Sequence, residues 1–353
     1  MLPLAVETKI RARLQAAVKE HVFPGCVFGV VNKDDERDLI AIGHHTYEQD
    51  SPLTSSESVF DVASLTKVLP TNLLALQLID QGKLGIHDLI RHYLPEMTSR
   101  ASEQATIHHL LTYTYLLKRD QPLAALITES PETIVRILFD TETAFVPGSK
   151  FHYSNTPSIL LGIILQRILN KSLVEAAQES VFDPLEMTHT TFTPQNPHLV
   201  VPTEINARGL VQGKVHDECA SALQQSFQPG CAGTFSTADD VLNALSMLLH
   251  DGVYKNHRLL SLTRIQELET NQLAKIGSSH GLGIELNQPH YMGSHCATTT
   301  IGKTGFTGTV IVSDRQRGIA FTLLSNRTFP TRPADGQGIN AVRHDIADLV
   351  WSI

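Results

Sequence analysis

The chain has 353 residues, of which 42% are hydrophobic and 18% are charged. This composition excludes a disordered chain, and the length allows one large domain or two modest ones with a sizeable core. The net charge of −8 disfavours a nucleic-acid-binding protein, because such a protein needs a basic surface. The four cysteines (Cys26, Cys219, Cys231 and Cys296) form no CxxC pair, so neither a zinc ribbon nor a disulfide scaffold is expected.

The N-terminal segment does not have the pattern of an export signal. Charged residues at Glu7, Lys9, Arg11 and Arg13 interrupt any apolar run. No apolar stretch elsewhere approaches the ~20 residues of a bilayer span, so no membrane partner is expected. We expect a cytoplasmic protein. A native start upstream of Met1 would instead permit a periplasmic location.

In chain order the pattern predicts helices at both ends and in the middle, with strands near the two ends. Apolar residues at helical spacing predict a helix over 6–20, and Pro24-Gly25 ends it. A buried helix over 68–81 is stopped by Gly82. The remaining predicted elements are strands at 26–31, 39–42, 282–286, 308–313 and 319–325, and helices at 157–169, 172–180, 238–250 and 338–351.

This order predicts an α/β (α+β) fold. The strands near the two ends form one antiparallel sheet flanked by the terminal helices, and an all-helical subdomain is inserted between them. We expect the sheet subdomain over about 1–62 and 281–353 and the helical subdomain over about 63–280. A cleft between such units is a favoured place for a ligand.

The chain contains one S-x-x-K motif, in which Lys67 follows Ser64 by three residues. On a helix the two side chains share a face, so the lysine amine can reach the serine hydroxyl. Serine is a poor nucleophile until a base takes its proton, and Lys67 can be that base if burial or another cation lowers its pKa. Backbone N–H groups at the start of a helix can also stabilise an oxyanion. The alternative is a helix-capping serine beside a solvated lysine.

A second motif, Y-x-N, places Tyr153 and Asn155 between a Pro147-Gly148 turn and the helix at 157–169. A phenol beside a nucleophile can relay its proton, and an amide can hold a substrate carbonyl. Another Y-x-N begins at Tyr254, in a charged turn that we interpret as surface. The pattern therefore gains meaning only beside the other motifs.

The third motif is K-T-G at Lys303, Thr304 and Gly305, leading into the strand at 308–313. A lysine and a threonine at a cleft edge suit a carboxylate or an acyl group, and Lys303 is the cation expected to keep Lys67 neutral. Gly305 lets the backbone come close to a ligand. The N–H of Phe306 is the expected second oxyanion donor. The alternative is a β-turn with exposed polar side chains.

S-x-x-K together with K-T-G marks serine β-lactamases and penicillin-binding proteins. With these motifs in the order S-x-x-K, Y-x-N, K-T-G, the sequence resembles the class C β-lactamase-related serine hydrolases. That family groups class C β-lactamases, D-alanyl-D-alanine carboxypeptidases, D-aminopeptidases and esterases. The resemblance covers most of the chain and includes the segments FDVASLTK, FVPGSKFHYSN and GKTGFTGTVIVSD.

The resemblance implies a β-lactamase/transpeptidase-like fold and a role for each motif residue. It makes Ser64 the acylated nucleophile, Lys67 its base partner, and Tyr153 a proton-transfer group in acylation and deacylation. It assigns the oxyanion hole to the N–H groups of Ser64 and Phe306. The substrate-binding residues that it implies are Asn155, Lys303, Thr304, Gly305 and Phe306.

The chain departs from the family pattern near the cleft. The family's usual L-L-T-H-T-S-G-L is replaced by a run in which Tyr115-Leu116 stand where Ser-Gly would be, so a bulkier wall and a different turn are expected. Pro70, early in the nucleophile helix, is expected to kink that helix or cost a hydrogen bond. Because Lys303 is retained where many esterase-like relatives have His, the motif favours carboxylate-bearing substrates.

Other patterns carry less weight. His216-Asp217 either lines the cleft or belongs to a hydrogen-bonded loop. Gly277 begins a G-x-S-x-G, but a predicted helical stretch (262–275) precedes it and a strand follows, which reverses the context of a nucleophile elbow. The near-P-loop before Lys303 leads into a strand, not a helix. The histidines contain no H-E-x-x-H, so we expect neither a metal nor another cofactor.

Two hypotheses follow. The first is a serine hydrolase that works through an acyl-enzyme at Ser64 on a small ester, a D-amino-acid peptide or a β-lactam. The second is a non-catalytic relative of the same fold that binds a ligand or assembles with itself. An intact Ser, Lys, Tyr and Lys set argues against the second, because a binding protein does not need it. The oligomeric state is left open.

Overall fold

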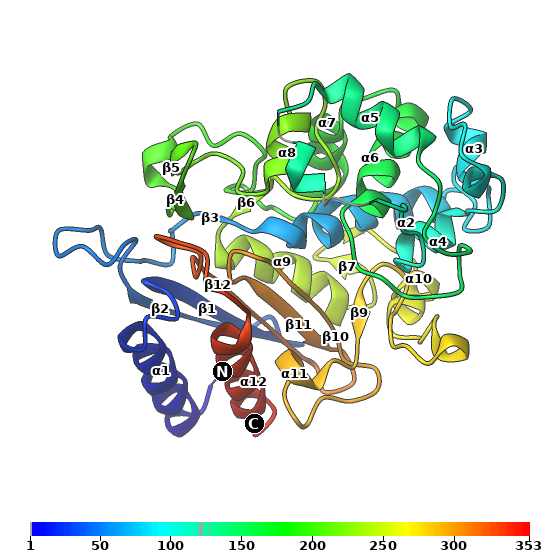
Figure 1. Ribbon diagram of the computed structural model, residues 1–353. Coiled ribbons are helices and arrows are strands. Elements are labelled where there is room, and N and C mark those ends of the chain that lie inside the picture. Colours follow the sequence, from blue (N-terminus) through cyan, green and yellow to red (C-terminus); the bar gives the residue numbers. More distant parts are fainter. Residues whose placement is uncertain (1, 120–122, 127) are drawn as a thin grey trace.

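The computed structural model describes residues 2–119, 123–126 and 128–353. At its centre is a six-stranded antiparallel sheet with strand order β2-β1-β12-β11-β10-β9 (Figure 1). Its strands are β1 (Gly25–Asn32), β2 (Arg37–Gly43), β9 (Glu285–Leu286), β10 (Ile301–Thr304), β11 (Val310–Asp314) and β12 (Ile319–Ser325). The first and last strands in the sequence lie side by side, with Val27 paired to Leu324. This confirms the prediction that the two ends of the chain form one sheet.

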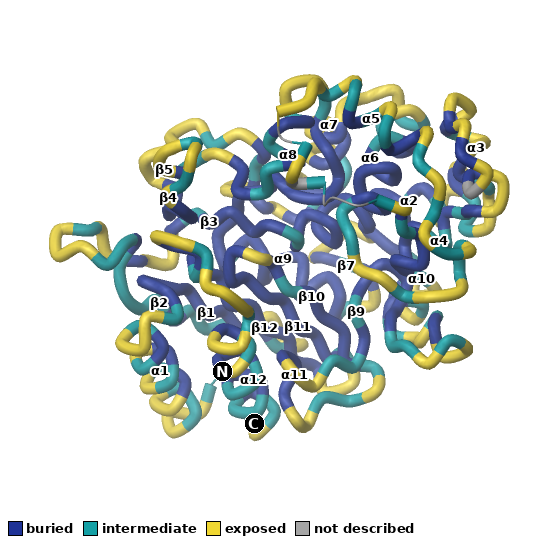
Figure 2. Tube along the Cα trace, in the orientation of Figure 1, coloured by how far each residue is buried: buried dark blue, intermediate teal, exposed yellow. Residues whose placement is uncertain are grey.

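The sheet is buried on both faces because its strands carry apolar side chains on both. Along β1, Phe28 and Val30 pack against the terminal helices α1 (Leu4–Lys19) and α12 (Gln337–Val350). Val27 and Val31, which point the other way, join the larger core. Figure 2 shows these strands buried and the outer sides of the two terminal helices exposed.

The second face of the sheet is covered by α9 (Ala238–Leu249), which begins at its N-cap Thr237. Gly29 of β1 allows this close packing, because a Cβ there would lie 3.1 Å from Leu242 of α9. The sequence analysis placed 238–250 in the helical subdomain, and in the structure this helix packs directly on the sheet. The division of the chain into two subdomains stays a prediction.

The other helices and three short strand pairs lie on the α9 side of the sheet, away from α1 and α12 (Figure 1). The exception is α11 (Pro289–Met292), which contacts α12. The helices are α2 (Leu73–Asp80), α3 (Ile90–Tyr93), α4 (Ile107–Leu111), α5 (Pro131–Asp140), α6 (Thr156–Leu169), α7 (Leu173–Ala177), α8 (Glu218–Leu223) and α10 (Leu262–Leu268). The strand pairs are β3 (Phe60–Asp61) with β6 (Phe235–Ser236), β4 (Glu204–Asn206) with β5 (Gly209–Val211), and β7 (Val253–Tyr254) with β8 (His257–Arg258).

Near the K-T-G motif, one predicted strand is shorter in the structure and one strand was not predicted. The predicted strand at 282–286 is reduced to the short β9, and β10 was not predicted as a separate strand. Lys303 and Thr304 lie at the end of β10, paired with Ile311 and Val310 of β11. The two strands form a hairpin, and the motif occupies its turn side. Among the described residues, no helix combines the length and the apolar character needed to cross a membrane.

Candidate active site

Ser64 lies in a 3-10 turn (Ala63–Lys67) that directly follows β3. The expected continuous helix does not form here. Leu69 is extended (φ −115°, ψ 99°), because a following proline disfavours the helical conformation, and the regular helix α2 starts only at Leu73. The prediction that Pro70 kinks the helix is confirmed. The turn is nevertheless tight enough to keep Ser64 and Lys67 on one side.

Two polar side chains donate hydrogen bonds to the Ser64 hydroxyl. The Lys67 Nζ lies 2.9 Å from Ser64 Oγ, and the Tyr153 hydroxyl lies 2.8 Å from the same atom. Lys67 is fully buried and donates a further bond of 2.7 Å to the carbonyl of Cys231. Tyr153 comes from the segment before α6 and keeps 38% of its surface exposed. The structure therefore brings together three residues that the S-x-x-K and Y-x-N motifs predicted.

The electrostatics around Tyr153 differ from the expectation. The ammonium of Lys303 lies 3.8 Å from the centre of the Tyr153 ring, and that of Lys67 lies 5.3 Å from it. Burial alone would raise the pKa of Tyr153, but these two cations outweigh burial and hold it below its usual value. For Lys67, burial alone would lower the pKa, but Tyr153 and its other neighbours hold it above its usual value. These directions run against the expectation that Lys303 keeps Lys67 neutral, because they favour the charged form of Lys67 and an easier loss of the proton from Tyr153.

Lys303 is itself paired with a carboxylate that sequence reasoning did not find. Its ammonium bonds to Glu285 of β9, which also accepts a 2.7 Å bond from the Tyr291 hydroxyl. Burial favours the neutral form of each partner, but their attraction holds the pKa of Lys303 above its usual value and that of Glu285 below it. The lysine is 2% exposed. Its charge is therefore compensated within the protein, which weakens the argument for a carboxylate-bearing substrate.

The turn after β10 is packed tightly against the nucleophile segment. A Cβ on Gly305 would lie 2.7 Å from the carbonyl oxygen of Val62, so no side chain fits there. The close approach that Gly305 permits is thus to this chain's own backbone. The buried Arg343 of α12 donates bonds of 3.0 and 2.8 Å to the carbonyls of Gly305 and Thr309 and fixes the turn from behind.

Phe306 lies in this turn and is 47% exposed. The guanidinium groups of Arg327 and Arg332 lie 5.0 and 5.6 Å from its ring centre. Its ring also lies 5.7 Å from that of His216. These contacts fix the residue whose N–H is the expected second oxyanion donor, and that role stays a prediction.

A pocket of about 140 Å³ opens beside Ser64. It is lined by Ala63, Ser64, His216, Asp217, Glu218, Ala232, Phe306 and Arg332. Arg332 was not predicted, because it lies outside the motifs. It pairs with both carboxylate oxygens of Glu204 at 2.8 and 2.9 Å and also with Glu218. No free cation of this wall faces the pocket, because the charge of Arg332 is compensated twice.

Asn155 and Thr304 lie at the margin of the site. The Asn155 amide donates a 2.9 Å bond to Asp217 Oδ2, so it supports a wall of the pocket. Thr304 is half-buried at the end of β10. Their predicted contacts with substrate stay predictions. The expectation that Tyr115 makes the wall of the cleft bulkier is wrong, because Tyr115 packs into the core. Tyr113 is the tyrosine beside the site, with its ring 5.2 Å from that of Tyr153.

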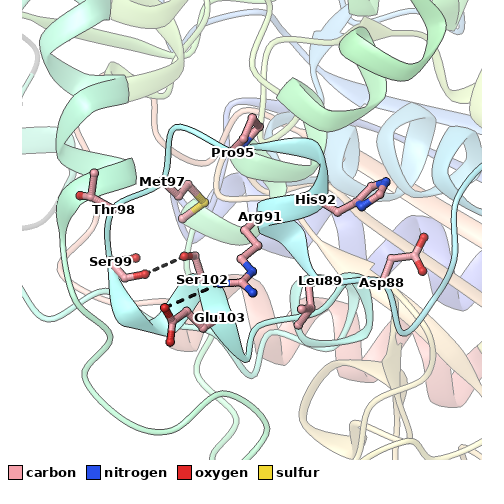
Figure 3. Close-up of a pocket in the computed structure, with 10 residues that line it drawn as sticks. All are labelled: Asp88, Leu89, Arg91, His92, Pro95, Met97, Thr98, Ser99, Ser102 and Glu103. Atoms are coloured by element: carbon pink, nitrogen blue, oxygen red, sulfur yellow. Dashed lines mark hydrogen bonds and ion pairs between the residues drawn. The ribbon is translucent and has the colours of Figure 1, made fainter.

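A larger pocket of about 800 Å³ lies elsewhere, around α3 (Figure 3). Its wall includes Arg91 and Glu103, whose charged ends face each other at 3.6 Å. The residues that line it are Asp88, Leu89, Arg91, His92, Pro95, Met97, Thr98, Ser99, Ser102 and Glu103. None of them belongs to the three motifs, so the smaller pocket at Ser64 is the candidate active site.

Comparison with known proteins agrees with this geometry. A family model described as Beta-lactamase matches residues 10–344, which include every residue of the three motifs. The chain belongs to the Beta-lactamase family. It is a serine hydrolase by this relationship, and its mixed α/β architecture is the β-lactamase/transpeptidase-like fold.

Two sequence relatives and one solved structure show what this Beta-lactamase family member is similar to. A protein of Escherichia coli O157:H7 with the provisional name D-alanyl-D-alanine carboxypeptidase is 29% identical over 303 residues, 76% of this chain and 69% of the relative. The N-acetylmuramyl-L-alanine amidase of Bacillus subtilis (strain 168) is 26% identical, over 86% and 77% of the two chains. The structure of EstCE1, a hydrolase with promiscuous acyltransferase activity, superposes with a TM-score of 0.79 at 20% identity, over 98% of each chain.

Asp61 connects two walls of the site. Its buried carboxylate accepts bonds of 2.8 Å from the N–H of Ala63, next to the nucleophile, and from the N–H of His216. Burial raises its pKa to about 6, above the ordinary value of 3.8. As the pH falls from 7 to 5, the folded chain therefore takes up this proton before the unfolded chain does, and the folded state gains stability.

We expect the free energy of unfolding of the wild type, relative to the Asp61→Asn variant, to increase by roughly 1 kcal/mol between pH 7 and pH 5. Urea unfolding at the two pH values measures this difference. The exposed Asp50→Asn variant serves as the control: the difference in free energy of unfolding between the wild type and this variant should be the same at both pH values. A difference between the wild type and Asp61→Asn that stays constant with pH would contradict the prediction.

Proposed function

We propose that this hydrolase forms an acyl-enzyme on Ser64 and cleaves small, uncharged esters. The observation that carries the proposal is the Ser64 hydroxyl, which contacts both Lys67 Nζ and the Tyr153 hydroxyl within 2.9 Å. A serine with two such partners, beside a pocket of its own, has the arrangement of an activated nucleophile. A capping serine beside a solvated lysine does not fit, because Lys67 is fully buried.

The lowered pKa of Tyr153 favours its phenolate as the base. In acylation the phenolate takes the proton of Ser64, and the Oγ attacks the ester carbonyl carbon. The tetrahedral oxyanion then lies toward the N–H groups of Ser64 and Phe306, which supply the expected stabilisation. As the carbon–oxygen bond breaks, the Tyr153 hydroxyl returns its proton to the leaving alkoxide. Lys67 and Lys303 stay protonated throughout.

Deacylation uses the same groups with water in place of the alcohol. Tyr153, again a phenolate after the alcohol leaves with its proton, takes a proton from water. The hydroxide attacks the acyl carbon and the bond to Ser64 Oγ breaks. The serine then recovers its proton from Tyr153, and the carboxylic acid product departs. No additional carboxylate base is required.

The charges around the site support an uncharged substrate over a carboxylate-bearing one. Lys303 is paired with Glu285, and Arg332 is paired with Glu204 and Glu218. A free carboxylate would have to displace one of these partners and would face Asp217 across the pocket. The curated relatives carry names for carboxypeptidase and amidase activities, so esters are proposed here from the charges of this chain.

Labelling of Ser64 tests the proposal. Intact-mass analysis after treatment with a fluorophosphonate should show a single adduct on the wild type, and the Ser64→Ala variant should show none. Hydrolysis of p-nitrophenyl acetate should disappear in the same variant. A wild type that forms no adduct and hydrolyses no ester would favour the non-catalytic, ligand-binding relative.

The two neighbouring tyrosines offer a matched pair of variants. Tyr153→Phe removes the hydroxyl that contacts Ser64, whereas Tyr113→Phe removes one that contacts Ser158 at 3.3 Å. We expect Tyr153→Phe to lower kcat/KM for p-nitrophenyl acetate by about 10²–10⁴-fold, the usual contribution of general acid–base catalysis. Tyr113→Phe should lower it by less than about tenfold. Equal losses in the two variants would contradict the role of Tyr153.

The pH profile reports which group is the base. If Tyr153 acts as phenolate, log kcat/KM rises with pH until that group has lost its proton. Lys303→Met removes a cation that holds the pKa of Tyr153 down, so the rising limb should move to higher pH.

The double variant Lys303→Met/Glu285→Gln avoids leaving the Glu285 carboxylate buried without a partner. We expect the same shift there, and the exposed Lys275→Met serves as the control. A limb that stays in place in the folded double variant would assign the titration to another group.

A further inference from the structure

His216 is the polar side chain of the pocket that has no assigned task. It is 2% exposed and lines the same pocket as Ser64. Among the described residues, neither of its ring nitrogens has a hydrogen-bond partner. The Glu204 carboxylate comes to 3.9 Å from Nδ1, which is beyond hydrogen-bond distance. Buried polar groups are nearly always hydrogen-bonded, so an imidazole without a protein partner beside a nucleophile points to a ligand.

Hydrogen bonds hold the backbone of His216 in place, so the position of its ring is fixed by the fold. Its N–H donates to Asp61 at 2.8 Å, and its carbonyl accepts a 2.7 Å bond from Arg208. The next residue, Asp217, caps α8 with a 2.8 Å bond to the N–H of Ala220. The ring itself lies against Phe306. These interactions fix the residue and leave its two ring nitrogens without a hydrogen-bond partner among the described residues.

The ring is uncharged under physiological conditions. Burial, together with the nearby guanidinium of Arg332, lowers the pKa of His216 to about 4. A neutral imidazole has one N–H donor and one bare nitrogen acceptor, and the proton can occupy either nitrogen. Such a ring suits an ether, hydroxyl or amide group and gives no ion pair with a carboxylate.

We propose that His216 recognises an uncharged hydrogen-bonding group on a short chain of the substrate while that substrate occupies Ser64. This inference rests on the proposed ester hydrolase function. The pocket of about 140 Å³ limits the chain to a few atoms, since a cavity of about 150 Å³ holds benzene. The substrate class is therefore a small ester whose acyl or alcohol part carries an ether, hydroxyl or amide oxygen.

Isosteric ester pairs test this recognition. The acyl pair is p-nitrophenyl methoxyacetate and p-nitrophenyl butanoate, and the alcohol pair is 2-methoxyethyl acetate and butyl acetate. Each pair exchanges one CH₂ for an oxygen. Dividing the kcat/KM ratio of a pair for the wild type by that for His216→Phe cancels the intrinsic reactivity of the esters. We expect the ether preference to fall about five- to tenfold in one pair, the effect of one hydrogen bond between neutral groups.

Two further measurements keep the test decisive. His216→Phe breaks no hydrogen bond within the described protein, so thermal unfolding should show it folded. His216→Gln keeps a donor and an acceptor and should retain part of the preference. Unchanged ratios in both pairs, or equal slowing of both members of each pair, would overturn the inference, because a structural or water-holding role acts on all esters alike. Retained fluorophosphonate labelling of Ser64 would show that the proposed function still stands.

Discussion

The site depends on two ammonium groups held against one phenol. Like charges at short range repel each other, so Lys67 and Lys303 can both stay protonated near Tyr153 only if other groups compensate them. Glu285 compensates Lys303 directly, and the Cys231 carbonyl accepts a bond from Lys67. The two ammonium groups still lower the pKa of Tyr153, so the phenol beside the Ser64 hydroxyl loses its proton more easily. The chemistry thus follows from an imbalance of charge that the fold maintains.

The fold maintains it by joining segments that are distant in the sequence. The segment of Ser64 and Lys67 follows a short strand on the α9 side of the sheet, and Lys303 lies at the end of a sheet strand. Asp61 connects the nucleophile turn to the His216 loop, and Arg343 connects the turn after β10 to the last helix. Because Gly305 has no side chain, the two backbones meet directly. The sheet and its terminal helices therefore act as the rigid frame on which the reacting groups are spaced.

The motifs predicted that Ser64, Lys67 and Tyr153 lie together. They did not predict which charged residues pair with one another around them. Fixed spacing makes Ser64 and Lys67 neighbours in any helical turn, and apolar periodicity located β12 and α12 closely. Glu285 and Arg332 had no such signal, because a lone charged residue says nothing about which distant partner it meets. The missed strand β10 contains a glycine and a lysine, which weaken a strand pattern, and its pairing with β11 supplies what the pattern lacks. The sequence does not show which of Tyr113 and Tyr115 faces the site, because this depends on the direction in which each side chain points from the backbone.

Compensation of the K-T-G lysine has a consequence for specificity. A lysine with a free charge can hold a substrate carboxylate, whereas Lys303 would have to leave Glu285 to do so, and the abandoned Glu285 would then be a buried, unpaired charge. The same holds for Arg332, whose two carboxylate partners border the pocket of Ser64. Recognition is then left to groups without charge, and His216 is the buried wall residue with free hydrogen-bonding capacity among the described lining residues. The proposed preference for uncharged esters therefore rests on one glutamate of the short edge strand β9, which pairs with the protonated K-T-G lysine.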